Sequence, residues 1–148
     1  MARVLVALGL AILGLFRCAQ ASAAPHEIAV FVTVQPETLA YGDKVTITVE
    51  ARNSGDSPIE YGRGSSSCRL DAVVRVNDID VPASVHRACL KDLGPWILAP
   101  GERRRERLFW TGAVAAPDTT YRLQPNTYEL RGAAGPFLSE PVEVEVRE

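Results

Sequence analysis

The segment KVTITVEARN, Lys44 to Asn53, indicates the fold more clearly than any other part of the chain. Apolar and polar residues alternate along it, with Val45, Ile47 and Val49 in one set and lysine, threonine and glutamate in the other. Side chains of a strand point alternately to its two faces, and one apolar face is typical of an antiparallel sheet packed on a core by one side. The segment therefore predicts a β-strand that is buried on one face.

Further segments of this kind lie on both sides of it and are separated by turn residues. The expected strands are residues 27–34, 44–53, 58–62, 68–76, 79–84, 95–98, 102–110, 127–132 and 141–148. Almost nothing in the chain follows a helical period. Together these segments predict an all-β protein, an antiparallel immunoglobulin-like β-sandwich of seven to nine strands.

The first residues have the composition of an export signal. Arg3 precedes an apolar run over residues 4–16, and small residues follow the run. The run is shorter than the roughly 20 residues that a bilayer requires. We therefore expect a signal peptide over residues 1–23, a single domain over residues 24–148, and an exported protein, either periplasmic or extracellular.

The charge balance argues against a nucleic-acid partner. The chain has 16 basic and 18 acidic residues, and two of the basic ones lie in the predicted signal peptide. The mature protein is thus acidic, whereas nucleic-acid binding usually requires a basic face. The one basic run, RRRER at residues 103–107, lies in an expected strand, where its arginines divide between two faces. Its charges are also typical of a protected edge strand.

Two cysteines remain after removal of the signal peptide, Cys68 and Cys89. In an oxidising compartment we expect them to form a disulfide bond. Such a bond closes a loop of about 20 residues and contributes roughly 3 kcal/mol on the chain-entropy model. The preceding GRGSSSC segment, Gly62 to Cys68, is interpreted as a flexible loop that this bond holds in place.

The order of several short motifs resembles the BsuPI-like intracellular proteinase inhibitor family. These motifs are NSGDSP after a strand, GSSSCRLDAVVRV, LAPGE at Leu98–Glu102, RLFWTG at Arg107–Gly112, PNTYEL at Pro125–Leu130 and a final VEVEV. The resemblance implies a small immunoglobulin-like sandwich that binds a subtilisin-type serine protease. The export signal and the cysteine pair are departures from the family's pattern. The same motifs also have structural interpretations: LAPGE predicts a type I or II turn with Pro100 at its second position.

The aromatic residues of the expected strands are interpreted as structural. Trp110 and Tyr128 lie beside leucines in alternating segments, so we expect core or corner positions for them. For Trp96 two positions stay open, over the disulfide or at a loop surface.

Enzymatic and metal-binding interpretations have weaker support. A bond between Cys68 and Cys89 would bring His86 near the serine run, but no GxSxG elbow or third catalytic member is present. Cys68, His86 and Cys89 supply only three of the four ligands that structural zinc requires. The NDID segment, Asn77 to Asp80, fits a hairpin better than a calcium loop. We expect no catalytic residues, no metal and no cofactor.

The sequence therefore predicts a non-enzymatic, exported protein-binding module, with proteinase inhibition as the activity that the resemblance implies. The binding segments are expected at residues 62–67 and 84–92, held rigid by the disulfide. The candidate contact residues are Arg63, Ser65, Ser66, Ser67, Arg87 and Lys91. The alternative is a structural or assembly module of the cell envelope that adds its edge strands to partner proteins.

Overall fold

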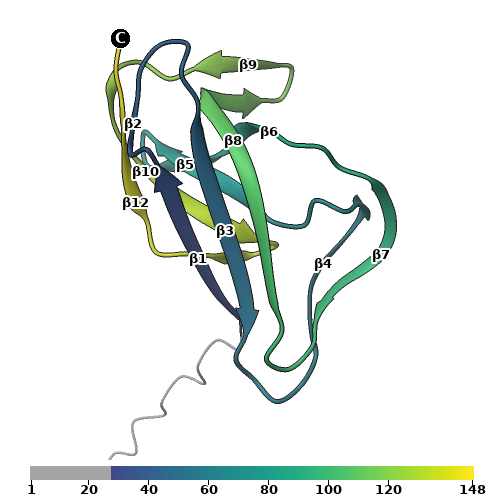
Figure 1. Ribbon diagram of the computed structural model, residues 1–148. Coiled ribbons are helices and arrows are strands. Elements are labelled where there is room, and N and C mark those ends of the chain that lie inside the picture. Colours follow the sequence, from purple (N-terminus) through teal and green to yellow (C-terminus); the bar gives the residue numbers. More distant parts are fainter. Residues whose placement is uncertain (1–27) are drawn as a thin grey trace, which may run out of the picture.

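The computed structural model describes residues 28–148, so the predicted signal peptide, residues 1–23, lies outside the described residues. The described part is all-β, as predicted (Figure 1), and contains no helix that could cross a membrane. Its strands are β1 (Ile28–Gln35), β2 (Thr38–Leu39), β3 (Val45–Asn53), β4 (Ile59–Ser66), β5 (Asp71–Val76), β6 (Ile79–His86), β7 (Lys91–Leu98), β8 (Arg103–Ala116), β9 (Thr119–Arg122), β10 (Asn126–Ala134), β11 (Phe137–Leu138) and β12 (Val142–Val146).

Nine of these strands correspond to the nine predicted segments. The other three, β2, β9 and β11, are two to four residues long, and alternation over so short a segment gives no recognisable signal. This is why the described residues contain more strands than the seven to nine predicted.

The strands form a sandwich of immunoglobulin-like order. One sheet runs β1, β3, β8 and then the second half of β6, and the other runs from the first half of β6 through β5, β10 and β12 to β2. Neighbours are antiparallel except β2 and β12. Immunoglobulin-type sandwiches place their first, second, fifth and fourth strands in one sheet and their third, sixth and seventh in the other, and the same order occurs here.

Strand β6 belongs to both sheets. Residues 79–82 pair with β5, and after Pro82 residues 83–86 pair with β8, with a register shift between Ala83 and Val85. Proline is tolerated where ladder pairing is interrupted, so Pro82 lies at a position where the strand can change sheets. The NDID segment forms the expected hairpin before this strand, with Asn77 and Asp78 at positive φ values of 50° and 64°.

The core lies between the two sheets and confirms the alternation of β3. Val45, Ile47, Val49 and Ala51 are completely buried. Trp110 of β8 is the largest of the completely buried side chains, and its Nε1 donates a hydrogen bond to the Ala113 carbonyl at 2.6 Å. Trp110 is thus a core residue, as the sequence predicts.

Tyr128 occupies a corner position at the start of β10. Its hydroxyl donates a 2.9 Å hydrogen bond to the Gln124 carbonyl, four residues upstream. A tyrosine at the start of the sixth strand that bonds back in this way is the tyrosine corner of immunoglobulin-like sandwiches. The bond fixes the connection that enters β10, in agreement with the expected corner role.

The buried side chain of Asn53 joins two turns at one end of the sandwich. Its Nδ2 donates hydrogen bonds to the Ser57 carbonyl at 2.7 Å and the Leu98 carbonyl at 3.0 Å, while its Oδ1 accepts one from the Gly55 N–H at 2.8 Å. The second turn is the one predicted at LAPGE: the Glu102 N–H donates to the Ala99 carbonyl at 2.9 Å, and Gly101 has a φ of +74°, which identifies a type II turn.

Replacement of Asn53 should destabilise the protein strongly. Asn53→Ala leaves two carbonyls without their donor and should lower the free energy of unfolding by about 2–3 kcal/mol. Asn53→Asp, which keeps the shape but places a carboxylate against the same carbonyls, should cost at least as much. Urea unfolding measures both, with exposed Asn126→Ala as the control. If the free energy of unfolding fell no more for either Asn53 variant than for the control, the role assigned to this amide would be contradicted.

Candidate functional site

Strands β4 and β7 form a two-stranded ribbon, here called the arm, beside the sandwich (Figure 1). Each strand lies in a connection between core strands: β4 between β3 and β5, and β7 between β6 and β8. Their antiparallel pairing runs from Ile59 opposite Leu98 to Ser66 opposite Lys91, with two irregularities. The first lies at Tyr61, whose side chain is buried (2% exposed) in the core. The arm is thus anchored to the sandwich at the end where Asn53 joins the turns.

The glycines of GRGSSSC form part of a strand and seat an indole ring. A Cβ atom on Gly62 would lie 2.7 Å from Cε3 of Trp96, and one on Gly64 would lie 2.5 Å from its Cζ2. The ring therefore covers both glycines, and any larger side chain there would displace it. The ring also lies beside Tyr61, with 6.1 Å between ring centroids. The prediction of a flexible loop over residues 62–68 is wrong for residues 62–66, because these belong to β4, which pairs with β7, and Trp96 covers both of their glycines.

The far end of the arm is closed by the predicted disulfide. Cys68 and Cys89 are bonded, with their Cα atoms 5.4 Å apart. Next to them, the Ser67 N–H donates to the Leu90 carbonyl at 2.8 Å, and the Ser67 Oγ accepts from the Leu90 N–H at 2.9 Å. The Ser66 Oγ accepts a 3.1 Å hydrogen bond from the Cys68 N–H. The two segments at this end are therefore held by one covalent bond and several hydrogen bonds.

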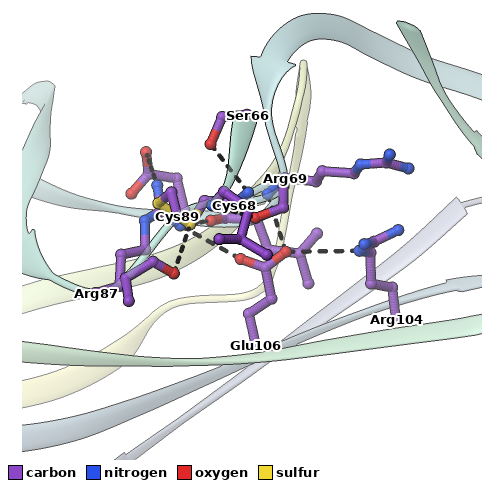
Figure 2. The surroundings of a disulfide bond; sticks show 12 residues. Ser66, Cys68, Arg69, Arg87, Cys89, Arg104 and Glu106 are labelled. Carbon is purple, nitrogen blue, oxygen red and sulfur yellow. Dashed lines mark hydrogen bonds and ion pairs between the residues drawn. A yellow bond between two sulfur atoms is a disulfide. The ribbon is translucent and has the colours of Figure 1, made fainter. Parts of the chain in front are cut away.

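A cluster of charged side chains connects this end to the sandwich (Figure 2). Glu106 of β8 accepts a hydrogen bond from the Arg69 N–H at 2.9 Å and pairs with Arg87 at 3.4 Å and Arg104 at 3.6 Å. The Arg87 guanidinium also donates to the Leu70 carbonyl and pairs with Asp71 at 3.2 Å. These contacts cross from the segments around the disulfide to β8, and they fix the orientation of the arm relative to the sheet.

The candidate contact residues are distributed over the arm and the segments next to the disulfide. Arg63 is exposed and forms a 2.6 Å ion pair with Glu60, and its hydrogen bond lowers the pKa of that carboxyl. Lys91 is exposed at the start of β7, opposite Ser66. Arg87 has only 19% of its side chain exposed and is engaged by the charged cluster. Ser66 and Ser67 both bond backbone groups, and Ser65 lies in β4.

The two chemical alternatives have little support in this arrangement. A metal site built from Cys68, His86 and Cys89 needs free thiols, and the disulfide uses both. Nucleophilic catalysis needs a base bonded to the nucleophile. His86 lies in β6 opposite Phe109, and no hydrogen bond links it to Ser66 or Ser67 within residues 28–148.

Two apolar residues at the far end of the arm are not among the predicted contact residues, although Leu90 lies within the predicted segment 84–92. Leu90 is 78% exposed and Leu93 is 73% exposed. Exposed single leucines are common, but here two lie three positions apart on the segment that follows Cys89. Their placement depends on the pairing of β4 with β7, and local alternation contains no signal for that pairing.

Comparisons with known proteins identify no family. No protein-family model matches the chain, and no curated protein is similar to it. Among solved structures, the DNA glycosylase AlkC of Pseudomonas fluorescens, bound to DNA with an abasic site analog, has a TM-score of 0.53 and 15% identity; the match covers 82% of this chain and 31% of that one.

Two further solved structures have lower TM-scores. A β-glucosidase of Listeria innocua in complex with glucose has a TM-score of 0.48 and 18% identity, covering 82% of this chain and 16% of that one. A CARDB domain from Pyrococcus furiosus, in complex with di-metal ions, has a TM-score of 0.46 and 14% identity, covering 81% and 87%. The chain spans less than a third of the glycosylase and the glucosidase. At these identities, the likeness to the glycosylase shows the fold alone.

The contact between Gly64 and Trp96 can be tested with a double-mutant cycle. Gly64→Ala should displace the indole and lower the free energy of unfolding by about 1–3 kcal/mol, the usual cost of overpacking. In a Trp96→Ala background the same substitution should cost much less, because the clashing ring is absent. Urea unfolding of the four proteins gives the coupling energy. An equal cost in both backgrounds would show that the glycine is needed for another reason.

Tyr61 should make stability fall at alkaline pH. Burial raises the pKa of its hydroxyl, with a smaller opposite effect of Arg104 and Arg69. Because the pKa is higher in the folded state than in the unfolded chain, the Tyr61 hydroxyl contributes to the free energy of unfolding. This contribution is complete below the unfolded-state pKa, near 10, and is lost as the pH rises through the folded-state pKa. Between pH 9 and 11 the free energy of unfolding should therefore fall less for Tyr61→Phe than for the wild type. The control, Tyr121→Phe at a 44% exposed position, should follow the wild-type curve; identical curves for all three proteins would refute the assignment.

Proposed function

We propose that this protein is an exported, non-enzymatic protein-binding module that contacts its partner through the far end of the arm. The observation that carries the proposal is the exposure of Leu90 and Leu93 on a segment whose two sides are joined by the disulfide. Exposed apolar side chains that cluster are typical of interaction sites. A segment that is already rigid loses little conformational entropy on binding, which favours affinity.

Exposed charged residues on the arm suit a polar rim. Lys91 is exposed and follows Leu90 directly, and Arg63 is exposed on β4 opposite Pro95. Interfaces commonly combine an apolar centre with a polar border. The disulfide supports export, since such bonds persist mainly in oxidising compartments. The Ser66 and Ser67 hydroxyls bond backbone groups and the two sulfur atoms are bonded to each other, which supports a binding role over a catalytic one.

A subtilisin-type serine protease is the partner class to test first. The resemblance of the motif order to the BsuPI-like family supports it, and an extended segment closed by a disulfide has a form that suits insertion into a protease cleft. The proposal of protein binding through the arm does not depend on this choice of partner.

Substitution of the two leucines should weaken binding without loss of the fold. The double variant Leu90→Ser/Leu93→Ser should inhibit subtilisin at least tenfold less than the wild type, because it removes the apolar centre of the contact. The matched control, Ile79→Ser/Leu138→Ser, changes two exposed apolar residues outside the arm. Inhibition constants and melting temperatures would be measured for all three. Absence of inhibition by the wild type would remove the protease assignment, and an equal effect of the control pair would remove the arm assignment.

Removal of the disulfide should loosen the arm. Cys68→Ser/Cys89→Ser should lower the free energy of unfolding by about 3 kcal/mol on the chain-entropy model and should weaken partner binding as well. The variant should respond to neither oxidant nor reductant, whereas the wild type should approach the behaviour of the variant after reduction. Unchanged stability together with unchanged affinity would contradict the proposed role of the bond.

A further inference from the structure

The first half of β8 is an edge strand. β8 pairs with β3 over residues 103–110, but β6 pairs with it only from Phe109 onward and ends at His86. Residues 103–107 of β8, here called the open edge, therefore have a strand neighbour on one side only in the described part of the chain. An edge of this kind presents backbone donors and acceptors in the spacing that another strand requires.

The backbone groups that face the open side can be identified from the pairing. The Asn53 N–H donates to the Glu102 carbonyl, so the C=O group of residue 102 faces β3. Backbone groups of successive residues point to opposite sides of a strand, so residues 104 and 106 also face β3. The N–H and C=O groups of Arg103, Arg105 and Arg107 consequently face away from β3, on the side that β6 has left.

A surface hollow of about 470 Å³ lies beside this edge. Its lining comes from Glu102, residues 103–107 of β8 and, around the disulfide, Ser67, Cys68, Arg87 and Ala88. The charged cluster shown in Figure 2 forms part of its wall. The arm and its disulfide thus border a space next to a strand that has one free side.

The charges at the open edge indicate which kind of segment fits. Arg103, Arg105 and Arg107 are exposed and share the outer face of the sheet, with about 6.8 Å between successive positions along the strand. Glu50 pairs with Arg105 at 2.6 Å. Two open edges from different copies would place arginine against arginine, which is unfavourable. A segment with acidic residues at alternate positions would place carboxylates opposite the arginines instead.

We infer that the open edge binds an extended, acidic segment of a partner protein as an added strand, antiparallel to β8 and in line with β6. Backbone hydrogen bonds to residues 103, 105 and 107 provide the pairing, and alternate acidic side chains provide the selection. The open edge is separate from the exposed leucines at the arm, so this inference does not depend on the proposed function.

The test uses the mature protein and the blocked peptide Ac-EVEVEVE-NH2. Two N-methylated forms serve as a matched pair, because in an antiparallel added strand the residues opposite Arg103, Arg105 and Arg107 point their N–H groups at β8. With glutamates opposite the arginines, methylation of the glutamate nitrogens should weaken binding at least tenfold, whereas methylation of the valine nitrogens should change it little. Binding is measured by isothermal titration calorimetry, and the peptide Ac-KVKVKVK-NH2 should not bind at the same concentration.

Amide hydrogen exchange locates the contact. Peptide addition should slow exchange at Arg103, Arg105 and Arg107 by at least tenfold, with little change at Arg104 and Glu106, which already face β3. Equal binding of both methylated peptides would show attraction of charge alone and would overturn the inference. Protection of residues 90–93 instead, or protection that appears without peptide as protein concentration rises, would also overturn it, since the occupant would then be at the arm or a second copy of this chain.

Two variants of one position separate the backbone from the charge. Arg105→Pro removes a single N–H that faces the open side, and Arg105→Thr removes the same charge but keeps the N–H. The proline variant should bind the peptide at least tenfold more weakly than the threonine variant. Equal binding by the two folded variants would overturn the inference. If the proline variant does not fold, the pair of methylated peptides decides the question with wild-type protein.

Discussion

The requirement that one strand serve two sheets shapes the rest of this molecule. β6 pairs with β5 and then with β8, and it can reach only the second part of β8 before it ends. β6 therefore joins the two sheets along the second part of β8, whereas residues 103–107 of β8 have no strand of the other sheet beside them in the part of the chain that the structure describes. The segment that leaves β6 and the segment that enters β5 both pass the open edge, and there they carry the cysteines and the charged cluster. The arm, the disulfide and the free side of β8 all follow from the place where β6 stops.

The arm shows how a small sandwich can carry a rigid projection without a second core. It contributes Tyr61 and Leu98 to the core of the sandwich. Within the arm the two backbones pair, and one indole ring covers two glycines. Hydrogen bonds from Asn53 order one end of the arm and the disulfide orders the other. Fixed ends replace the burial that a ribbon of two strands otherwise lacks. The exposed Leu90 and Leu93 side chains therefore lie on a segment that the fold already orders.

Much of the fold could be predicted because its signals are local. The alternation of Val45 to Ala51, the turn at Pro100 and the hairpin at Asn77 each depend on a few adjacent residues, and each occurs as predicted. The disulfide followed from counting cysteines. The glycines at positions 62 and 64 indicate a flexible loop from the sequence alone, but a glycine-rich segment is ordered when another strand pairs with it and a side chain covers it. Here that side chain is Trp96, about 30 residues away, and the pairing of β4 with β7 has no signature in either strand. Arg87 was expected at a contact surface for a similar reason: its three partners lie on segments that only the fold brings together.

The two irregularities of the arm restrict how its length can change. The first irregularity leaves Tyr61 without an opposite residue on β7. At the second, β4 has one residue between Gly64 and Ser66, whereas β7 has two between their partners Gly94 and Lys91. Each strand is eight residues long, so the two offsets compensate and both strands meet the disulfide together. An insertion in one strand alone would reverse the faces of every residue beyond it. Across evolution, insertions and deletions in β4 should therefore be matched by changes in β7, and an alignment of related chains should show their lengths varying together.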